Sequence, residues 1–307
     1  MITRTDVLAA ADRITGRVRR TPLLAAGPEM FFKLEYVQHT GSFKARGALN
    51  NVLAARERGD LGPAGVVAAS GGNAGLAVAW AATQVGVPAE IHVPATAPAV
   101  KVKRLQALGA TVVQTGPEYS HAYAASGERA ALTGAFQCHA YDQLEMVAGA
   151  GTISLELLEQ LPSGVDTVLV AVGGGGLIGG IAAALAQTPV RVVAVEPVAA
   201  PSLHAALAHG GPVDVEVGGV AADSLGARRA GTIAYEVAAG TGLRSLLVDD
   251  AAIRDARQRL WDEWRIVVEP GAACAYAGLT AGAYRPEKGE RVAVVLCGAN
   301  TDPGDLA

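Results

Sequence analysis

The chain has 307 residues, of which 25 are Lys or Arg and 29 are Asp or Glu, and its formal net charge is −4. The lack of a basic field argues against a nucleic-acid partner, and no apolar run reaches the roughly 20 residues that span a bilayer. Half of the residues are apolar and only 5% are aromatic, which favours helices packed on parallel sheets. Three widely spaced cysteines, Cys138, Cys274 and Cys297, predict a reducing cytoplasm rather than a disulfide framework.

The first functional stretch follows a short strand predicted at residues 30–34. It reads His39-Thr40-Gly41-Ser42-Phe43-Lys44-Ala45-Arg46-Gly47-Ala48. Ser42 is expected to cap the next helix and Gly59 to end it, so Lys44 falls in the first turn. The helix dipole disfavours a cation there and, with partial burial, lowers the pKa of Lys44, which frees the amine for attack on a carbonyl. An ordinary solvated lysine is the alternative.

Residues 65–137 alternate between strand and helix patterns. Strands are predicted at 65–69, 89–93, 111–113 and 135–137, with helices at 76–85, 99–108 and 119–132 between them. The turn after the first of these strands reads Ser70-Gly71-Gly72-Asn73-Ala74-Gly75. This alternation predicts a parallel sheet with right-handed crossovers.

The second half repeats this order. Helices are predicted at 151–160, 177–186, 202–209, 232–239, 251–264 and 272–283, and strands at 167–172, 191–195 and 291–296. The glycine turn Gly173–Gly176 joins the first strand to its helix, and the last strand ends in Cys297-Gly298-Ala299-Asn300.

Two turns share one form, in which a buried strand leads through glycines into a helix. Free N–H groups and the dipole make each helix start an anion site. The turn at Gly173–Gly176 lets a phosphate approach closely, whereas the hydroxyl of Ser70 and the amide of Asn73 suit a carboxylate or a phenolic oxygen. The plain alternative is that these glycines only permit tight turns.

A dinucleotide site is a competing interpretation. Gly174, Gly176 and Gly179 fit G-x-G-x-x-G after a strand, and Glu196 ends the next strand. This interpretation predicts a nicotinamide-dependent dehydrogenase, but it leaves Lys44 and the Ser70 turn unexplained.

Taken together, the motifs around Lys44, Ser70–Gly75 and Gly173–Leu177 resemble the pyridoxal-phosphate (PLP) dependent threonine/serine dehydratases, which have the tryptophan synthase β-type fold (fold type II). The resemblance spans nearly the whole chain in order and spacing. It implies two three-layer αβα domains with mainly parallel sheets and PLP in the cleft between them. The large domain would comprise residues 1–45 and 141–307, and the small domain residues 46–140.

The resemblance also implies roles for individual residues. Lys44 would hold PLP as a Schiff base and then serve as general base, with Phe43 against the ring. Asn73 would bind the phenolic oxygen and Cys297 would face the pyridine nitrogen. The phosphate would be cradled by Gly173, Gly174, Gly175, Gly176 and Leu177, and the substrate carboxylate by Ser70, Gly71, Gly72 and Asn73.

The reaction implied is α,β-elimination of water from L-threonine or L-serine, giving a 2-keto acid and ammonia. Cys297 is a neutral partner for the ring nitrogen, which disfavours a long-lived carbanion and favours elimination; it also reads as a small buried hydrophobe. Ala74 resembles the serine dehydratase branch, and Gly71, where serine racemases carry a serine, predicts weak racemisation. A PLP lyase for hydroxyaspartate or phenylserine-type substrates stays open.

A cation site is implied as well. Glu196, Ala200 and Ser202 fall where dehydratase relatives bind a cation, and carbonyls of Leu225 and Ala227 would complete the site. The single carboxylate suits a monovalent ion such as K⁺, although Glu196 could equally cap or pair locally. We also expect a homodimer, and, because no regulatory domain follows Asn300, a catabolic role.

Overall fold

The computed structural model describes residues 1–306, and its strands form two separate sheets. The larger sheet has the order β1-β2-β10-β7-β8-β9 and the smaller the order β5-β4-β3-β6. All neighbouring strands are parallel except β1 and β2. The predicted α/β fold with two mainly parallel sheets is therefore confirmed. The strands are β1 Leu23–Ala25, β2 Met30–Lys33, β3 Val66–Ala69, β4 Ala89–Val93, β5 Thr111–Gln114, β6 Phe136–Cys138, β7 Thr167–Ala171, β8 Arg191–Pro197, β9 Arg244–Val248 and β10 Val292–Val295.

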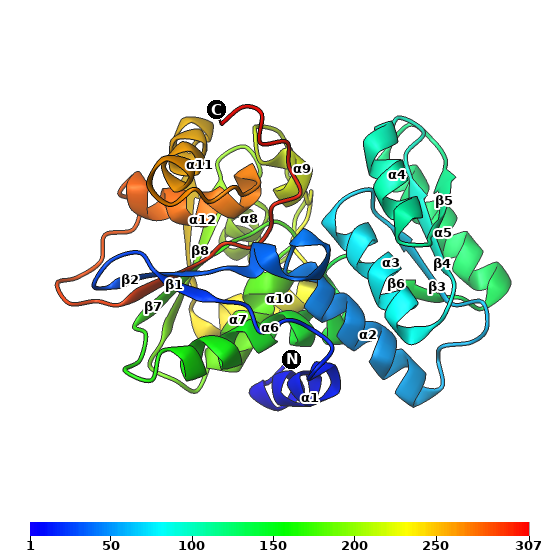
Figure 1. Cartoon of the computed structure of the whole chain (residues 1–307), viewed down its shortest axis with the longest axis horizontal. Helices are drawn as coiled ribbons and strands as arrows, with labels where there is room; N and C mark the ends of the chain where they lie inside the picture. The colour runs from blue at the N-terminus through cyan, green and yellow to red at the C-terminus, as the bar shows by residue number, and fades with distance from the viewer. Residues whose placement is uncertain (307) are drawn as a thin grey trace.

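Helices cover both faces of the larger sheet. In Figure 1, α11 and α12 lie above it, whereas α6 and α7 lie below. The helices are α1 Arg4–Ile14, α2 Lys44–Arg58, α3 Asn73–Val85, α4 Ala99–Ala107, α5 Tyr119–Thr133, α6 Leu144–Gln160, α7 Gly176–Leu185, α8 Ser202–His209, α9 Ala222–Leu225, α10 Thr232–Thr241, α11 Asp250–Trp264 and α12 Pro270–Thr280. Short 3₁₀ turns occupy Glu35–Val37 and His39–Gly41. Among the described residues, no helix combines the length and apolar character needed to cross a membrane.

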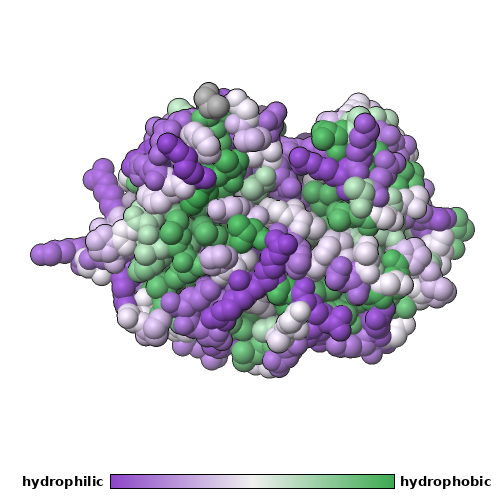
Figure 2. All heavy atoms as spheres, viewed as in Figure 1, coloured by the Kyte–Doolittle hydropathy of each residue, from purple (hydrophilic) through white to green (hydrophobic). Residues whose placement is uncertain are grey.

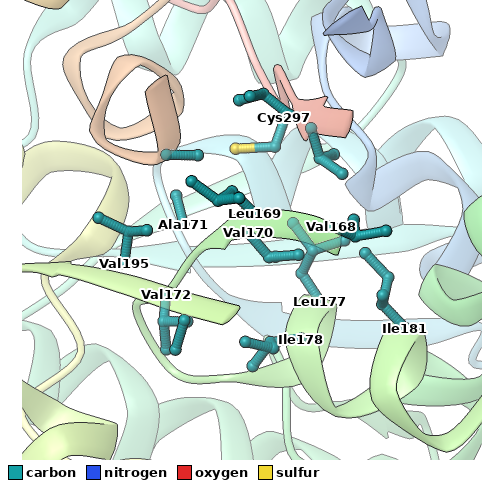
Figure 3. Packing of buried hydrophobic residues seen from close by; sticks show 14 of the residues in the cluster. Val168, Leu169, Val170, Ala171, Val172, Leu177, Ile178, Ile181, Val195 and Cys297 are labelled. Atoms are coloured by element: carbon teal, nitrogen blue, oxygen red, sulfur yellow. The ribbon is translucent and has the colours of Figure 1, made fainter. Parts of the chain in front are cut away.

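The central strands are buried because helices cover both of their faces. All five residues of β7 are buried, as are all four of β3 and of β10. Such uninterrupted apolar strands are typical of parallel sheets. Figure 3 shows Val168, Leu169 and Val170 of β7 packed with Leu177 and Ile181 of α7.

Two clusters of buried apolar residues accompany the two sheets. One surrounds the larger sheet, and the other fills the space between β3, β4, α2 and α3. On the face shown in Figure 2, a notch separates the two lobes at the top, between α9 and α4 of Figure 1. The domain boundaries at residues 45/46 and 140/141 stay a prediction.

Most predicted elements agree with the structure to within three residues, but helix α6 starts earlier than predicted, and β1, β9 and the one-turn helix α9 were not predicted. Helix α6 begins at Leu144 rather than 151, because Gly149 and Gly151 conceal the helical pattern of its first half. Strand β9 was not predicted, since it lies at the sheet edge and begins with the polar pair Arg244-Ser245.

Helix α6 crosses both α2 and α7 at glycines. A Cβ on Gly149 would lie 2.7 Å from the Cα of Gly47 in α2, and one on Gly180 of α7 would lie 2.6 Å from the backbone nitrogen of Gly151. The backbones touch at both crossings, so neither leaves room for a methyl group. These crossings fix α2, which carries Lys44, relative to α7, which follows the Gly173–Gly176 turn.

The α6–α7 crossing predicts a stability effect. We expect Gly180→Ala to destabilise the protein by about 1–3 kcal/mol, because the new Cβ would lie 2.1 Å from the carbonyl oxygen of Val147 and backbone must shift. Urea unfolding measures the loss. Gly62→Ala is the control, since a Cβ there meets nothing within 4 Å; equal midpoints for the two variants would contradict the prediction.

Candidate active site

Lys44 is the first residue of α2, as predicted, but Ser42 does not cap the helix. Ser42 is extended (φ −159°, ψ 159°) and forms a β-bridge with Gly298, and the cap residue is Phe43. The backbone N–H of Phe43 donates to the carbonyl of Cys297 at 3.0 Å. The Ser42 cap prediction is wrong because this bridge to the end of β10 fixes the backbone in another way. Gly59 ends the helix with a left-handed conformation (φ 82°), as expected.

The Lys44 amine is held close to neutral protein groups. Nζ donates to the carbonyl oxygen of Ala140 at 2.9 Å and lies 4.9 Å from the centroid of the Phe43 ring. Part of the side chain stays accessible, yet protein atoms surround the amine, and this burial lowers the pKa of Lys44 to about 8, while Cys297 and Glu269 act in the opposite direction. The predicted lowering is confirmed, with burial as its leading cause.

A cavity joins Lys44 to the glycine turn before α7. It is lined by Phe43, Lys44, Gly47, Ala140, Tyr141, Met146, Ala150 and Gly176. Gly175 adopts φ 88°, and a Cβ on Gly174 would lie 2.4 Å from Cδ1 of Tyr141, so this turn requires glycine. The free N–H groups at the start of α7 and the Lys44 amine thus border one space.

Gly71, Gly72 and Asn73 of the next turn line a second cavity, together with residues of both lobes. The hydroxyl oxygen of Ser70 accepts from the N–H of Gly72 at 3.3 Å, and Asn73 is the first residue of α3. The cavity is lined by Gly71, Gly72, Asn73, Leu76, Lys101, Arg104, Asp223, Ser224, Glu269 and Asn300. Residues from α3, α4, α9 and the start of α12 therefore surround the predicted carboxylate loop.

The Asn73 amide is bound by two residues that sequence reasoning missed. Its Nδ2 donates to both carboxylate oxygens of Glu269, at 2.8 and 3.1 Å, and its Oδ1 accepts from Asn300 Nδ2 at 2.7 Å. The same Nδ2 of Asn300 donates to the carbonyl of Thr40 at 2.8 Å, in the turn before Lys44. Glu269 is 6% exposed, and burial raises its pKa. The predicted bond from Asn73 to a phenolic oxygen stays a prediction.

Cys297 lies where β10 ends and is 3% exposed. Its side chain belongs to the core around the larger sheet, and Figure 3 shows it at the edge of that cluster. Burial raises the pKa of its thiol, so the group is neutral. A neutral, buried thiol near Lys44 agrees with both interpretations of this residue.

The predicted cation ligands lie around Gly173, but the carboxylate among them has other partners. Glu196 is buried, and its oxygens accept from the N–H groups of Leu203 and His204, both at 2.8 Å, and from Ser245 Oγ at 2.9 Å. It therefore caps α8, and burial raises its pKa to about 7.

The other members of the set are positioned by the backbone. Ser202 Oγ donates to the carbonyl of Gly173 at 2.6 Å, and a Cβ on Gly173 would lie 2.9 Å from the Cα of Leu225. The Leu225 carbonyl accepts from the N–H of Ala227, and the N–H of Ala200 donates to Pro197. Within residues 1–306 no three His, Cys, Asp or Glu side chains gather as metal ligands.

Glu269 and Asn300 were not predicted as site residues because both are far from Asn73 in the sequence and meet it only in the folded chain. The one signal in the sequence was their position: Asn300 follows Cys297 closely, and Glu269 precedes a proline at the start of α12.

The dinucleotide interpretation finds no support in this geometry. Both oxygens of Glu196 bind α8, so its carboxylate is not turned toward a ligand at the glycine turn.

The Lys44 amine and the start of α7 border one cavity, and such an arrangement is typical of proteins that hold a phosphorylated carbonyl compound. The family comparison agrees: residues 14–298 match the model of the family "Pyridoxal-phosphate dependent enzyme". The chain belongs to this family, in its fold type II branch of threonine/serine dehydratase-like enzymes.

Three relatives illustrate the breadth of this branch. An L-threonine ammonia-lyase of Geobacter sulfurreducens is 37% identical and is aligned over 98% of this chain and 76% of its own length. A phenylserine dehydratase of Ralstonia pickettii is 35% identical over 96% of this chain and 92% of its own. The solved structure of maize serine racemase has a TM-score of 0.92 and 33% identity, covering 99% of this chain and 95% of its own.

The environment of Lys44 predicts how its amine titrates. In the protein without cofactor, the amine should be half protonated near pH 8, against the ordinary value of 10.5, because burial disfavours the charged form. Competitive acetylation of the Lys44 peptide across pH, read by mass spectrometry, measures this value. Glu269→Gln should lower it further by removing a carboxylate. Titration at pH 10 or above would contradict the prediction.

Proposed function

We propose that this enzyme eliminates water from a β-hydroxy amino acid, with L-threonine and L-serine as substrates, giving a 2-keto acid and ammonia. The single observation that carries the proposal is the cavity that Lys44 shares with Gly176 at the start of α7. When bound, PLP supplies the electron sink that this elimination needs.

The residues present fit the cofactor. Lys44 would hold its aldehyde carbon, because the amine is buried, has a lowered pKa and donates only to a carbonyl. The phosphate would lie at Gly173–Leu177, where the turn leads into the N–H groups at the start of α7. Phe43 and Cys297 would border the ring, and the Asn73 amide would bind its phenolic oxygen in exchange for a bond to Glu269.

Lys44 would also move the proton. An amine with a pKa of about 8 is partly unprotonated near neutral pH, so it is able to take the α-proton as general base. The substrate carboxylate would bind at Ser70–Asn73, where the start of α3 presents free N–H groups.

Elimination is favoured over racemisation because no second acid–base side chain would face Lys44 across the substrate. Racemisation needs a second proton donor, and Gly71 has no side chain that could supply one. This distinguishes the chain's expected activity from that named for maize serine racemase. The phenylserine dehydratase relative supports water elimination as the reaction while leaving a bulkier β-substituent as the alternative substrate class.

A spectrum with matched variants tests the proposal. Purified enzyme should absorb in the visible with PLP, and it should release 2-keto acid from L-threonine or L-serine. Lys44→Ala should lose the visible band and at least 10³-fold in rate, since it lacks both anchor and base. Lys288→Ala, an exposed lysine, is the control. A colourless wild type that stays colourless with added PLP would refute the function.

The monovalent cation stays a prediction, as does the homodimer. Glu196 already accepts three hydrogen bonds, so a cation at Ala200, Ser202, Leu225 and Ala227 would share that carboxylate. If K⁺ binds the folded state, replacing it with choline at constant ionic strength should lower the thermal midpoint and kcat/KM by a few-fold. Identical thermal midpoints and kcat/KM values in both salts would contradict the prediction of a cation site.

A further inference from the structure

One hydroxyl group in the cavity at Asn73 has no protein partner. Ser224, on the short helix α9, lines this cavity together with Asn73 and Glu269. Its Oγ is buried, yet within the described residues 1–306 it forms no hydrogen bond. A buried hydroxyl without a partner is destabilising, so such a group in a folded protein calls for an explanation. A substrate in the adjoining cavity would supply the missing partner.

The side chain of Ser224 occupies space that a glycine leaves free. A Cβ on Gly271, at the start of α12, would lie 2.1 Å from Oγ of Ser224 and 3.1 Å from its Cβ. A larger residue at position 271 would therefore displace the hydroxyl. The position of the hydroxyl is thus set by the packing of α9 on α12.

Helix α9 also connects the cavity to the rest of the candidate site. A Cβ on Gly173 would lie 2.9 Å from the Cα of Leu225, the residue after Ser224, so α9 packs directly on the glycine turn before α7. Burial lowers the pKa of the Lys44 amine, and the Glu269 carboxylate, which lines the cavity with Ser224, is close enough to oppose this effect. The Ser224 hydroxyl therefore lies between elements that contact the phosphate turn and the lysine.

The other polar side chains on the α9 and α12 side of the cavity already have partners. Glu269 and Asn300 both bind the Asn73 amide. Asp223 forms an ion pair with α4. The substrate carboxylate is assigned to the turn before α3, so the Ser224 hydroxyl is the group left on this side of the cavity for the rest of the substrate.

We propose that Ser224 is a substrate-binding residue whose hydroxyl donates a hydrogen bond to the β-hydroxyl of the amino acid. The inference rests on the proposed elimination and adds a residue to it. A serine hydroxyl both donates and accepts, so it matches another neutral hydroxyl. Negative charge develops on the β-oxygen as the carbon–oxygen bond breaks, and a donor that is already in place stabilises this charge. Ser224 donates this bond without transferring its proton.

A pair of substrates that differ in the leaving group tests the assignment. The PLP-loaded enzyme is assayed by initial rates with L-serine and with β-chloro-L-alanine, which loses chloride and has no β-hydroxyl. We expect Ser224→Ala to lower the ratio of kcat/KM for L-serine over β-chloro-L-alanine at least tenfold. Ser163→Ala removes an exposed hydroxyl that does not line the cavity and should leave the ratio within twofold of wild type.

Two further measurements separate binding from a structural role. The thermal midpoint of Ser224→Ala, loaded with PLP and without substrate, should not fall, because the hydroxyl has no partner in the protein. Gly271→Ala keeps the hydroxyl but forces it to move, so it should lower the same substrate ratio. Gly271→Ala thus tests the position of the hydroxyl independently of its removal.

The outcomes distinguish this inference from the proposed function. An unchanged ratio for Ser224→Ala, or an equal loss with both substrates, overturns the role of Ser224 and leaves the lyase in place. A ratio that falls for Ser224→Ala and stays constant for Ser163→Ala supports it. Turnover of neither substrate by wild type that carries PLP refutes the lyase itself, and the inference with it.

Discussion

The position of Lys44 depends on a buried ion-pair network around Arg46, which follows it by two residues. Arg46 is 1% exposed; its guanidinium donates to both oxygens of Glu35, at 2.8 Å, and to Glu156 at 2.7 Å. Lys33, at the end of β2, binds the other oxygen of Glu156 at 2.7 Å. The network thereby joins the larger sheet, α2 and α6. Removing one partner of such a buried set leaves an unpaired charge and costs about 3–5 kcal/mol, so the start of α2 is rigidly fixed.

This network also explains why burial controls the Lys44 amine. Its two cations and two carboxylates balance, so the network adds no net charge beneath α2. The Lys44 amine itself lies against the Ala140 carbonyl and the Phe43 ring, and the Cys297 thiol is neutral. Desolvation then outweighs the attraction of Glu269, and the amine's pKa falls. The lowered pKa of Lys44 thus comes from burial, against the attraction of Glu269, rather than from a second cation beside the amine.

The sequence was informative where a local pattern decides the outcome. Buried strands such as β7, and glycine turns that start helices, have patterns within one window, so β4 and α8 were predicted with both ends correct. The prediction from sequence failed where a distant segment binds the backbone of a residue. Ser42, for example, forms a β-bridge with Gly298 instead of capping α2. The partners of Asn73 were missed for a similar reason, because Glu269 and Asn300 lie 196 and 227 residues away. Side chains that meet only after both sheets have formed leave no periodic signal.

The two sheets contribute different halves of the site, and a few polar contacts align them. The larger sheet carries the Gly173–Gly176 turn and Cys297, whereas the smaller sheet leads into Asn73. Asn300 binds both Thr40 and Asn73 with a single amide nitrogen, so the turn before Lys44 and the start of α3 share one donor. The Lys101–Asp223 pair makes a second contact across the cleft, nearer to solvent. A change in the relative position of the sheets must break these bonds, so polar contacts align the carboxylate turn with the turn before Lys44. The glycine crossings of α6 align the lysine with the phosphate turn.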